Sequence, residues 1–304
     1  MARLTTIPDT ENAGSIWYNT DIEKMQYSYN ILSSGTWSSG GSLPVGLYDS
    51  GSAGIQNAAL TFGASSGYST CSYEYNGSSW STGGSLSNNR YCCTLGAGTQ
   101  NSALSFGGSS YCTEEYNGTS WSEGGSQNQV KYCGMGFGVQ NAALAVATYV
   151  SEEYNGSSWS YSNILINNRD LGTGLGEQNA GLVIGGCYST NYCPCTEEYN
   201  GTSWATAAQY IAGGTNGSTK MASGGIQNDG YTFGGFEFGN SITNNTYLYI
   251  GGSWSTGGCM NNSRYSLSGI GGVKSGLAIG GVGVSYTDTE EFNRTVTGIN
   301  TCTL

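Results

Sequence analysis

The stretch Glu114-Glu115-Tyr116-Asn117-Gly118-Thr119-Ser120-Trp121 decides the fold, because variants of it recur along the whole 304-residue chain. The other copies, several of them decayed, are at 27–37, 73–80, 152–159, 197–204, 247–254 and 290–297. Successive copies are 38 to 50 residues apart. A period of this length that runs from one end of a chain to the other predicts a repeat architecture.

The composition indicates an all-β protein. The chain holds 51 Gly and 23 Tyr but only 3 Pro, a balance typical of turns and aromatic strands and not of helices. The repeat continues without a Pro-rich linker or a run of charges. We therefore expect one domain over residues 14–304, preceded by an N-terminal extension at 1–13.

The chain is acidic, with a net charge of −11 and only 9 Lys and Arg residues. We expect no nucleic-acid partner, because binding to phosphates needs clustered cations. Residues 1–9 lack the apolar run of a signal peptide, and no later stretch is apolar over the length of a membrane span. The sequence thus predicts synthesis in the cytoplasm and no membrane insertion.

One repeat unit contains four predicted strands. Small and apolar residues at 93–98 and 103–108 indicate the first two, and alternation at 113–116 indicates the third. Asn117-Gly118 is a strong hairpin signal and leads into a fourth strand at 120–122. Each unit is therefore predicted to be a four-stranded antiparallel meander.

The order of features in each unit resembles the kelch motif, over about residues 14 to 298. A hydrophobic strand ends in two glycines, and a variable loop, a Glu-x-Tyr strand, a turn, a Trp and a basic residue follow. The glycine pairs are Gly107 and Gly108, Gly185 and Gly186, Gly234 and Gly235, and Gly280 and Gly281, with departures at Gly63-Ala64 and Ala147-Thr148. The basic residues, ten positions after each Trp, are Arg90, Lys131, Arg169 and Arg264, whereas Leu47 and Gly214 break the pattern.

The resemblance implies a kelch-type β-propeller, in which four-stranded blades form a ring. A lone meander cannot bury both of its faces, so each blade must pack on its neighbours and the ring must close. We expect the repeated Trp and Tyr residues to fill the space between blades, and the double glycines to let a neighbouring backbone or ring approach. The repeated tryptophans are Trp37, Trp80, Trp121, Trp159, Trp204 and Trp254.

Seven blades are predicted from the count of strands. The sequence contains six pairs of inner strands but seven third strands. The surplus lies at 15–19, 24–29 and 36–38, which would make three strands of a blade that lacks its first, and the tail 299–304 is available to supply it. Pairing of the N- and C-terminal strands would then close the ring. The alternative is six blades and a separate N-terminal hairpin.

The repeated glutamates have a predicted structural role. Neighbouring residues of a strand point to opposite faces, so a pair such as Glu114-Glu115 is not a catalytic pair in space. We expect the second glutamate to accept hydrogen bonds from the backbone or from the basic residue of the following blade. These glutamates are Glu74, Glu115, Glu153 and Glu198, and the basic residues are Arg90, Lys131 and Arg169.

The 10 cysteines are an unusual number for a cytoplasmic product. Cys71 and Cys92 are separated by the same distance along the chain as Cys112 and Cys133, so one geometry would bridge neighbouring blades twice. Buried free thiols, which pack as small hydrophobic groups, are the alternative.

A second group of cysteines lies in a single loop. Cys187, Cys193 and Cys195 have no His and no second Cys-x-x-Cys pair beside them, so their spacing is poor for zinc. We expect a local disulfide here and no metal site.

The sequence offers few candidate catalytic residues. The chain contains no His, which removes the commonest general base and the usual activator of a nucleophile. Tyr75, Tyr116, Tyr154 and Tyr199 stand where the Asp box of sialidases has its Asp, so similarity to that group fails at its defining residue. We expect no catalytic residue, no cofactor and no enzymatic activity, and a carbohydrate-active enzyme is the least favoured function.

The parts that do not repeat are the candidates for binding, because loops on a rigid scaffold carry specificity. The longest are 67–70, 109–113, 187–196 and 236–246, which mix aromatic residues with Ser, Asn and Gly in a way suited to recognition. Their aromatic residues are Tyr68, Tyr111, Tyr188, Tyr192, Phe236 and Phe238.

Two motifs bear on the biological context. Asn12-Ala13-Gly14-Ser15-Ile16-Trp17-Tyr18-Asn19-Thr20, followed by 24–27, resembles a hairpin common in bacteriophage tail-fibre and other virion-surface proteins. The Tyr-Asn-Gly-Thr-Ser-Trp repeat is similar to kelch-like repeats of predicted marine phage proteins. The resemblance implies a non-enzymatic virion protein, either a tail-fibre or receptor-binding component or a capsid decoration, that attaches to the host through its loops.

The expected partners follow from that context. They are other virion proteins, further copies of the same chain, and a glycan or protein receptor on the host surface. A kelch-type protein–protein interaction module is the alternative function.

Overall fold

The protein consists of β-strands connected by turns and loops. The computed structural model describes residues 16–19, 24–64, 70–90, 93–189, 191–210, 217–239 and 241–303. These residues contain no helix, and so no helix among them is long and apolar enough to cross a membrane. The all-β prediction is confirmed.

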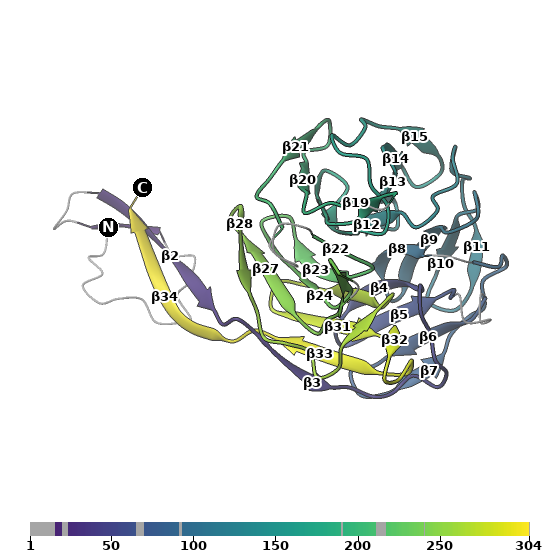
Figure 1. Cartoon of the computed structure of the whole chain (residues 1–304), viewed down its shortest axis with the longest axis horizontal. Helices are drawn as coiled ribbons and strands as arrows, with labels where there is room; N and C mark the ends of the chain where they lie inside the picture. Colours follow the sequence, from purple (N-terminus) through teal and green to yellow (C-terminus); the bar gives the residue numbers. More distant parts are fainter. Residues whose placement is uncertain are drawn as a thin grey trace.

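Six four-stranded antiparallel sheets are arranged around a common centre, as Figure 1 shows. In five of them the strands follow one another from the centre outward in chain order, which is the predicted meander.

Sheet 1 contains β4 (Gly51–Ile55), β5 (Ala58–Phe62), β6 (Ser72–Tyr75) and β7 (Trp80–Thr82). Sheet 2 contains β8 (Thr94–Thr99), β9 (Ser102–Gly107), β10 (Glu114–Tyr116) and β11 (Trp121–Glu123). Sheet 3 contains β12 (Met135–Val139), β13 (Ala142–Ala147), β14 (Val150–Tyr154) and β15 (Trp159–Tyr161). Sheet 4 contains β16 (Thr173–Glu177), β17 (Ala180–Ile184), β20 (Thr196–Tyr199) and β21 (Trp204–Thr206). Sheet 5 contains β23 (Ala222–Ile226), β24 (Asp229–Phe233), β27 (Thr246–Ile250) and β28 (Ser253–Thr256).

Sheet 6 brings together two segments from opposite ends of the chain. It consists of β30 (Ser268–Gly271), β31 (Ser275–Ile279) and β33 (Thr289–Asn293), with β3 (Thr36–Ser39) as its outer strand. Figure 1 shows β3 and β33 side by side, one purple and the other yellow. An N-terminal strand therefore completes the last sheet.

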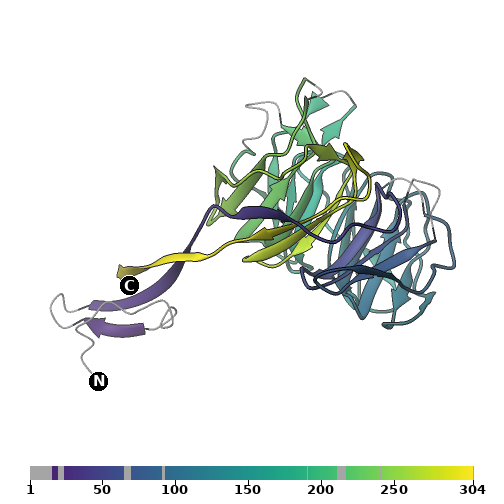
Figure 2. The ribbon, with the colours of Figure 1, turned by 90° about the horizontal axis from the view of Figure 1, so that it is seen from below.

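A separate three-stranded sheet projects from this body, as Figures 1 and 2 show. It has the order β1 (Ile16–Asn19), β2 (Lys24–Leu32), β34 (Val296–Thr303). The two terminal segments do pair here, as β2 with β34. The predicted seventh blade is wrong, because 36–39 pairs with the open edge of β33 and not with β2. The predicted extension at 1–13 lies outside the described residues.

The reason for this pairing is the side chain of Trp37. Its ring lies 4.8 Å from that of Phe233 in sheet 5 and 4.9 Å from that of Phe292 in sheet 6. Placing β3 at the outer edge of sheet 6 therefore buries an indole between two sheets, and it also pairs the backbone of β33.

Short strands in the loops form three further small sheets. They are β18 (Cys187–Tyr188) with β19 (Asn191–Tyr192); β22 (Ser218–Thr219) with β25 (Phe236–Glu237) and β26 (Ser241–Ile242); and β29 (Arg264–Tyr265) with β32 (Val282–Gly283).

The first strand of each sheet lies at the centre of the molecule. The strands β4, β8, β12, β16, β23 and β30 pack side by side in this order, and β30 packs against β4. Small residues allow the close approach: a Cβ atom at Gly96 would lie 2.3 Å from the carbonyl oxygen of Ser52 in the neighbouring sheet. A central channel remains, and its two ends are lined by the first and the last residues of the same strands.

Each repeated tryptophan packs against the preceding sheet, and all of them donate a hydrogen bond to it except Trp121, whose ring lies 4.8 Å from that of Phe62. The indole N–H of Trp80 donates to the hydroxyl of Thr289 at 3.0 Å, and that of Trp159 donates to Thr113 at 2.8 Å. The equivalent pairs are Trp37 with Thr246, Trp204 with Ser151, and Trp254 with Thr196. Trp37, Trp80, Trp121, Trp159 and Trp204 are buried, and Trp254 is half-buried.

Two further repeated side chains reach into the preceding sheet. The Tyr116 hydroxyl donates to Glu74 at 2.6 Å, and Gln100 Nε2 donates to the carbonyls of Ala59 and Tyr75 at 3.0 and 2.8 Å. Burial raises the pKa of Tyr154 to about 12, which keeps this hydroxyl a donor. The equivalent tyrosine–glutamate pairs are Tyr75–Glu291, Tyr154–Glu115, Tyr199–Glu153 and Tyr249–Glu198. The equivalent glutamines are Gln56, Gln140, Gln178 and Gln227.

The double glycines adopt a conformation that other residues rarely take. All eight residues of the four pairs have positive φ. A Cβ atom at Gly280 would lie 2.4 Å from the carbonyl oxygen of Leu47, and one at Gly185 would lie 2.7 Å from that of Ser218. Backbone of the neighbouring loop, and not an indole ring, approaches these two positions.

The repeated basic residues are buried and paired with the first glutamate of each Glu-Glu sequence. The pairs are Arg90–Glu114 at 3.3 Å, Lys131–Glu152, Arg169–Glu197 and Arg264–Glu290 at 3.0 Å. The expectation that Glu74, Glu115, Glu153 and Glu198 bind these cations is wrong. Because neighbouring strand residues point to opposite faces, the second glutamate of each pair turns to a tyrosine hydroxyl instead.

The two sheets that lack the basic residue also lack its glutamate. Tyr73 replaces it in sheet 1 and packs in one core cluster with Leu47. Tyr247 replaces it in sheet 5, where its ring lies 5.4 Å from that of Tyr210. Buried cation and buried anion are therefore present or absent together, as the cost of an unpaired buried charge requires.

This exchange gives the first testable prediction. Arg90→Leu leaves the buried Glu114 unpaired, and we expect a loss of about 3–5 kcal/mol in the free energy of unfolding, measured with denaturant. Arg90→Leu combined with Glu114→Tyr copies the apolar pair of sheet 1, and we expect it to recover most of that loss. A harmless single substitution, or a double variant as unstable as the single one, would contradict the pairing rule.

The outer strand of sheet 6 gives the second prediction. Deleting 1–32 together with 296–304 removes the projecting sheet and keeps every strand of the six four-stranded sheets, so we expect the melting temperature to stay unchanged. Extending the N-terminal deletion to residue 39 removes β3 and the buried Trp37. Loss of a buried Trp alone costs about 3–5 kcal/mol, so this second variant should unfold at much lower denaturant concentration. Equal stability of the two deletions would show that β3 does not complete sheet 6.

Candidate functional site

The two faces of the molecule are built from different kinds of sequence. All six inner strands begin at one end of the channel and finish at the other. Because the sheets are antiparallel, the loops between second and third strands and the connections between sheets share the end where the inner strands begin. We call this end the loop face, and the opposite end the turn face.

The turn face is made of repeated short turns. The side-chain oxygen of Asn117 accepts hydrogen bonds from the backbone N–H groups of Thr119 and Ser120, both at 3.0 Å, and Gly118 has φ +93°. The same turn is formed at Asn76, Asn155 and Asn200. This turn offers the same groups at four of the six sheets, whereas the loop face differs from sheet to sheet.

The predicted binding residues that the structure describes lie in loops of the loop face. Tyr111, Tyr188 and Phe238 have exposed fractions of 52%, 53% and 56%, whereas Tyr192 and Phe236 are half-buried. The ring of Tyr192 lies 5.9 Å from that of Phe238, which joins two of these loops. Tyr68 lies outside the described residues.

A groove on the same face was missed from the sequence. It is lined by Gln129, Tyr132, Thr148, Tyr149 and Asp170, among others. Tyr132 and Tyr149 are 61% and 47% exposed. The sequence held a signal, since Thr148 replaces a glycine of the double-glycine pattern, but the loop around it is short and so lacks the length that marks the other candidate binding loops.

Asp170 fixes the shape of this groove. Its carboxylate accepts hydrogen bonds from the backbone N–H of Thr148 at 2.6 Å and from the Thr148 hydroxyl at 3.1 Å. Thr148 has φ +55°, a conformation that is uncommon for a residue other than glycine. Burial raises the pKa of the Asp170 carboxyl, and the hydrogen bonds from Thr148 oppose that shift. The hairpin that carries Tyr149 is thereby held to the neighbouring sheet.

The channel opens at the centre of the loop face. One residue with positive φ, just before each inner strand, forms the rim of the opening, and we call these six the mouth residues. They are Asp49, Cys93, Cys133, Leu171, Lys220 and Ser266. Backbone hydrogen bonds connect neighbouring mouth residues, as from Lys220 N–H to Leu171 O at 2.7 Å and from Ser266 N–H to Lys220 O at 2.9 Å.

The mouth carries two opposite charges and two thiols. Lys220 Nζ lies 5.5 Å from the centre of the Tyr265 ring, within the range of a cation–π contact. Asp49 Oδ1 lies 3.9 Å from Cys93 Sγ. Within the residues that the structure describes, no three Cys, Asp or Glu side chains are grouped so that they could hold a metal ion.

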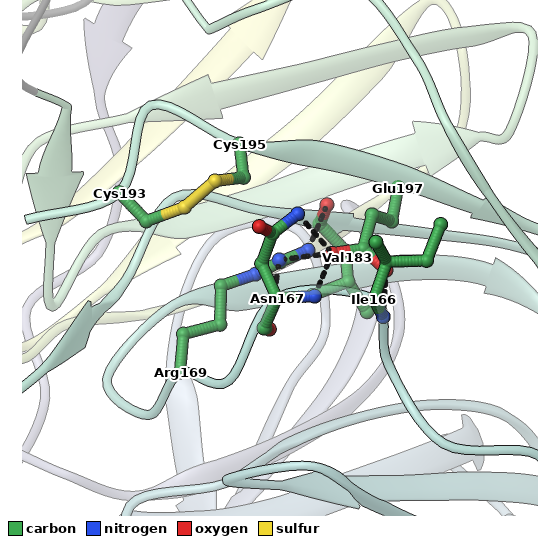
Figure 3. The surroundings of a disulfide bond; sticks show 7 residues. All are labelled: Ile166, Asn167, Arg169, Val183, Cys193, Cys195 and Glu197. Carbon is green, nitrogen blue, oxygen red and sulfur yellow. Dashed lines mark hydrogen bonds and ion pairs between the residues drawn. A yellow bond between two sulfur atoms is a disulfide. The ribbon is translucent and has the colours of Figure 1, made fainter.

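The cysteines follow the sequence predictions in part. Cys193 and Cys195 form the expected local disulfide, with a Cα–Cα distance of 5.1 Å, and Cys187 stays free. Figure 3 shows this disulfide beside the Arg169–Glu197 pair.

The predicted bridges between blades have a different outcome. Cys112 and Cys133 are both free, because the Cys133 thiol lies at the channel mouth against Cys93 and Cys112 lies in the loop after β9. Cys71 is free as well, and Cys92 lies outside the described residues.

Comparison with known proteins identifies the fold. No protein-family model matches the chain, and no curated protein is similar to it in sequence. Among solved structures, YjhT matches with a TM-score of 0.68 and 13% identity, over 86% of this chain and 99% of that one. At this identity the likeness concerns the fold alone. YjhT has a fold of the kelch-like β-propeller type, and the four-stranded antiparallel sheets described above fit the same type.

Proposed function

We propose that this protein is a non-enzymatic binding protein of a bacteriophage virion surface, which attaches to the host through its loop face. The virion context is supported by the two sequence resemblances given above. The binding role is supported by one structural observation: the exposed tyrosines Tyr111, Tyr132, Tyr149 and Tyr188 all lie in loops of the loop face. The repeated aromatic residues are buried in contacts between sheets, so they are not available for recognition.

We further propose that the six sheets are the blades of one complete ring. The supporting contacts run from sheet 1 back to sheet 6, since β4 packs on β30 and Trp80 donates to Thr289. In this ring β3 supplies the closing strand. A closed ring is rigid, and it holds the loops of the loop face in a fixed arrangement.

The groove of Tyr132 and Tyr149 is the part of the loop face best suited to a ligand. Two tyrosine rings offer flat apolar surface with a polar tip, and Gln129, Thr148 and Asp170 supply donors and acceptors beside them. A sugar ring matches such a site, because it has an apolar face of C–H groups and a rim of hydroxyls. The net charge of −11 disfavours a polyanion, so the favoured ligand is a neutral glycan of the host surface.

A protein partner is the second candidate, and one observation favours it. Ile164 and Ile166, in the connection between β15 and β16, are 63% and 56% exposed. Exposed large aliphatic side chains close together are typical of protein interfaces. This surface suits contact with another virion protein or the partner of an interaction module, and the tyrosine groove remains for the host.

Substitution of the groove tyrosines tests the proposed ligand. We expect labelled protein to bind neutral polysaccharides on an array of bacterial surface glycans. Loss of a central aromatic contact costs about 2 kcal/mol, roughly 30-fold in affinity, so Tyr132→Ala and Tyr149→Ala should each weaken binding by that order. Tyr161→Ala is the matched control, because Tyr161 is 60% exposed on the outer strand β15. No binding to any glycan, or an equal effect of Tyr161→Ala, would contradict the proposal.

A mass-spectrometric count on purified particles tests the virion context independently. We expect a fixed copy number of this chain per particle. A chain found only in the infected cell and absent from particles would exclude the virion role and favour an interaction module.

A further inference from the structure

Cys93 and Cys133 occupy equivalent places in neighbouring sheets. Both are mouth residues with positive φ, of 57° and 47°, just before β8 and β12. These two inner strands pack side by side. Both thiols are free, and each is close enough to the other to shift its pKa.

The junction between these two residues differs from the others around the mouth. In the part of the chain that the structure describes, a backbone hydrogen bond crosses the mouth at each of five junctions, for example from Asp49 N–H to Ser266 O at 2.9 Å and from Leu171 N–H to Cys133 O at 2.8 Å. No such bond between described residues crosses from Cys93 to Cys133. Among the described residues, two thiols therefore lie at the junction that no backbone hydrogen bond crosses.

The surroundings make one thiol the more reactive of the two. The interaction with Cys93 lowers the pKa of Cys133 and the Lys220 ammonium acts in the same direction, whereas burial and the carboxylates of Asp49 and Asp170 oppose them. The interaction with Cys133, together with burial, raises the pKa of Cys93. Both side chains are half-buried, and Cys93 lines the open channel, so a small oxidant can approach the pair from there. Cys133 is thus placed to be the thiolate and Cys93 its protonated partner.

We propose that Cys93 and Cys133 form a redox-active dithiol, whose oxidation to a disulfide joins sheets 2 and 3 at the mouth of the channel. The oxidant is a low-molecular-weight disulfide such as oxidised glutathione. The Cys133 thiolate attacks one of its sulfurs, which releases one small thiol and leaves a mixed disulfide on Cys133. Cys93 then loses its proton and attacks Cys133 Sγ, which releases the second small thiol. Two protein thiols are oxidised, and one small disulfide is reduced to two thiols.

The proposed bond supplies what this junction lacks. A covalent link between sheets 2 and 3 would replace the missing backbone hydrogen bond and hold the rim of the loop face together. It would form when the protein leaves a reducing cytoplasm for an oxidising surrounding. The chain would thus fold with free thiols and gain the link afterwards.

Disulfide mapping of the full-length protein tests this pairing. The protein is incubated with oxidised glutathione, its remaining thiols are alkylated, and it is digested with trypsin without reduction. Trypsin cuts after Arg90, Lys131 and Arg169, so the expected product is fragment 91–131 linked to fragment 132–169, which separates on reduction. Recovery of both fragments alkylated and unlinked would overturn the proposal.

Single substitutions identify the partner, because fragment 91–131 contains Cys92, Cys93 and Cys112. Cys93→Ser should abolish the link, whereas Cys92→Ser and Cys112→Ser should leave it intact. Serine is suitable at this place, since Ser266 is the mouth residue of sheet 6 with φ +53°. We also expect oxidation to raise the melting temperature of the unsubstituted protein and not that of Cys93→Ser. A link that survives in Cys93→Ser, or a melting temperature that oxidation leaves unchanged, would contradict the proposal.

Discussion

Each sheet of this molecule depends on side chains that the next sheet provides, and the rest of the structure follows from this dependence. Three repeated groups, an indole N–H, a tyrosine hydroxyl and a glutamine amide, all point from one sheet to the one before it. A row of such sheets would leave donors unsatisfied at one end and acceptors at the other. Sheet 1 meets this requirement through sheet 6, where Gln56 donates to the carbonyls of Gly276 and Phe292.

The same dependence distinguishes the residues that form the scaffold from those that are free to bind a ligand. The repeated Glu, Tyr and Trp residues make buried contacts, and the repeated Asn and Gly residues form turns at the turn face. In the part of the chain that the structure describes, each of the four repeated buried cations meets a glutamate, and the two sheets without such a cation carry tyrosine in place of that glutamate. What varies from sheet to sheet is exposed on the loop face, where the tyrosine groove, the apolar Ile164 and Ile166 and the channel mouth lie.

The repeated parts of the structure were predicted well from the sequence alone. The parts that occur only once were predicted poorly. Local pattern sufficed for the meander, the Asn-Gly turn and the all-β class, since these depend on residues close in the chain. The placement of 36–39 depended on a competition between two edges far apart in sequence, β2 and β33, which Trp37 decides by packing on Phe233 and Phe292. Periodicity also misled: the equal spacing of Cys71–Cys92 and Cys112–Cys133 suggested bridges, whereas Cys133 lies near Cys93, because the two residues precede β12 and β8, which pack side by side.

The central claim is that a rigid repeated scaffold binds its ligand only through the loop face. Hydrogen–deuterium exchange, with and without a neutral host-surface polysaccharide that the protein binds, tests this claim most directly. The account predicts added protection in residues 124–134 and 147–150, around Tyr132 and Tyr149, and none in the Asn-Gly turns at 76–79, 117–120, 155–158 and 200–203. Protection centred on those turns, with the tyrosine groove unchanged, would contradict it.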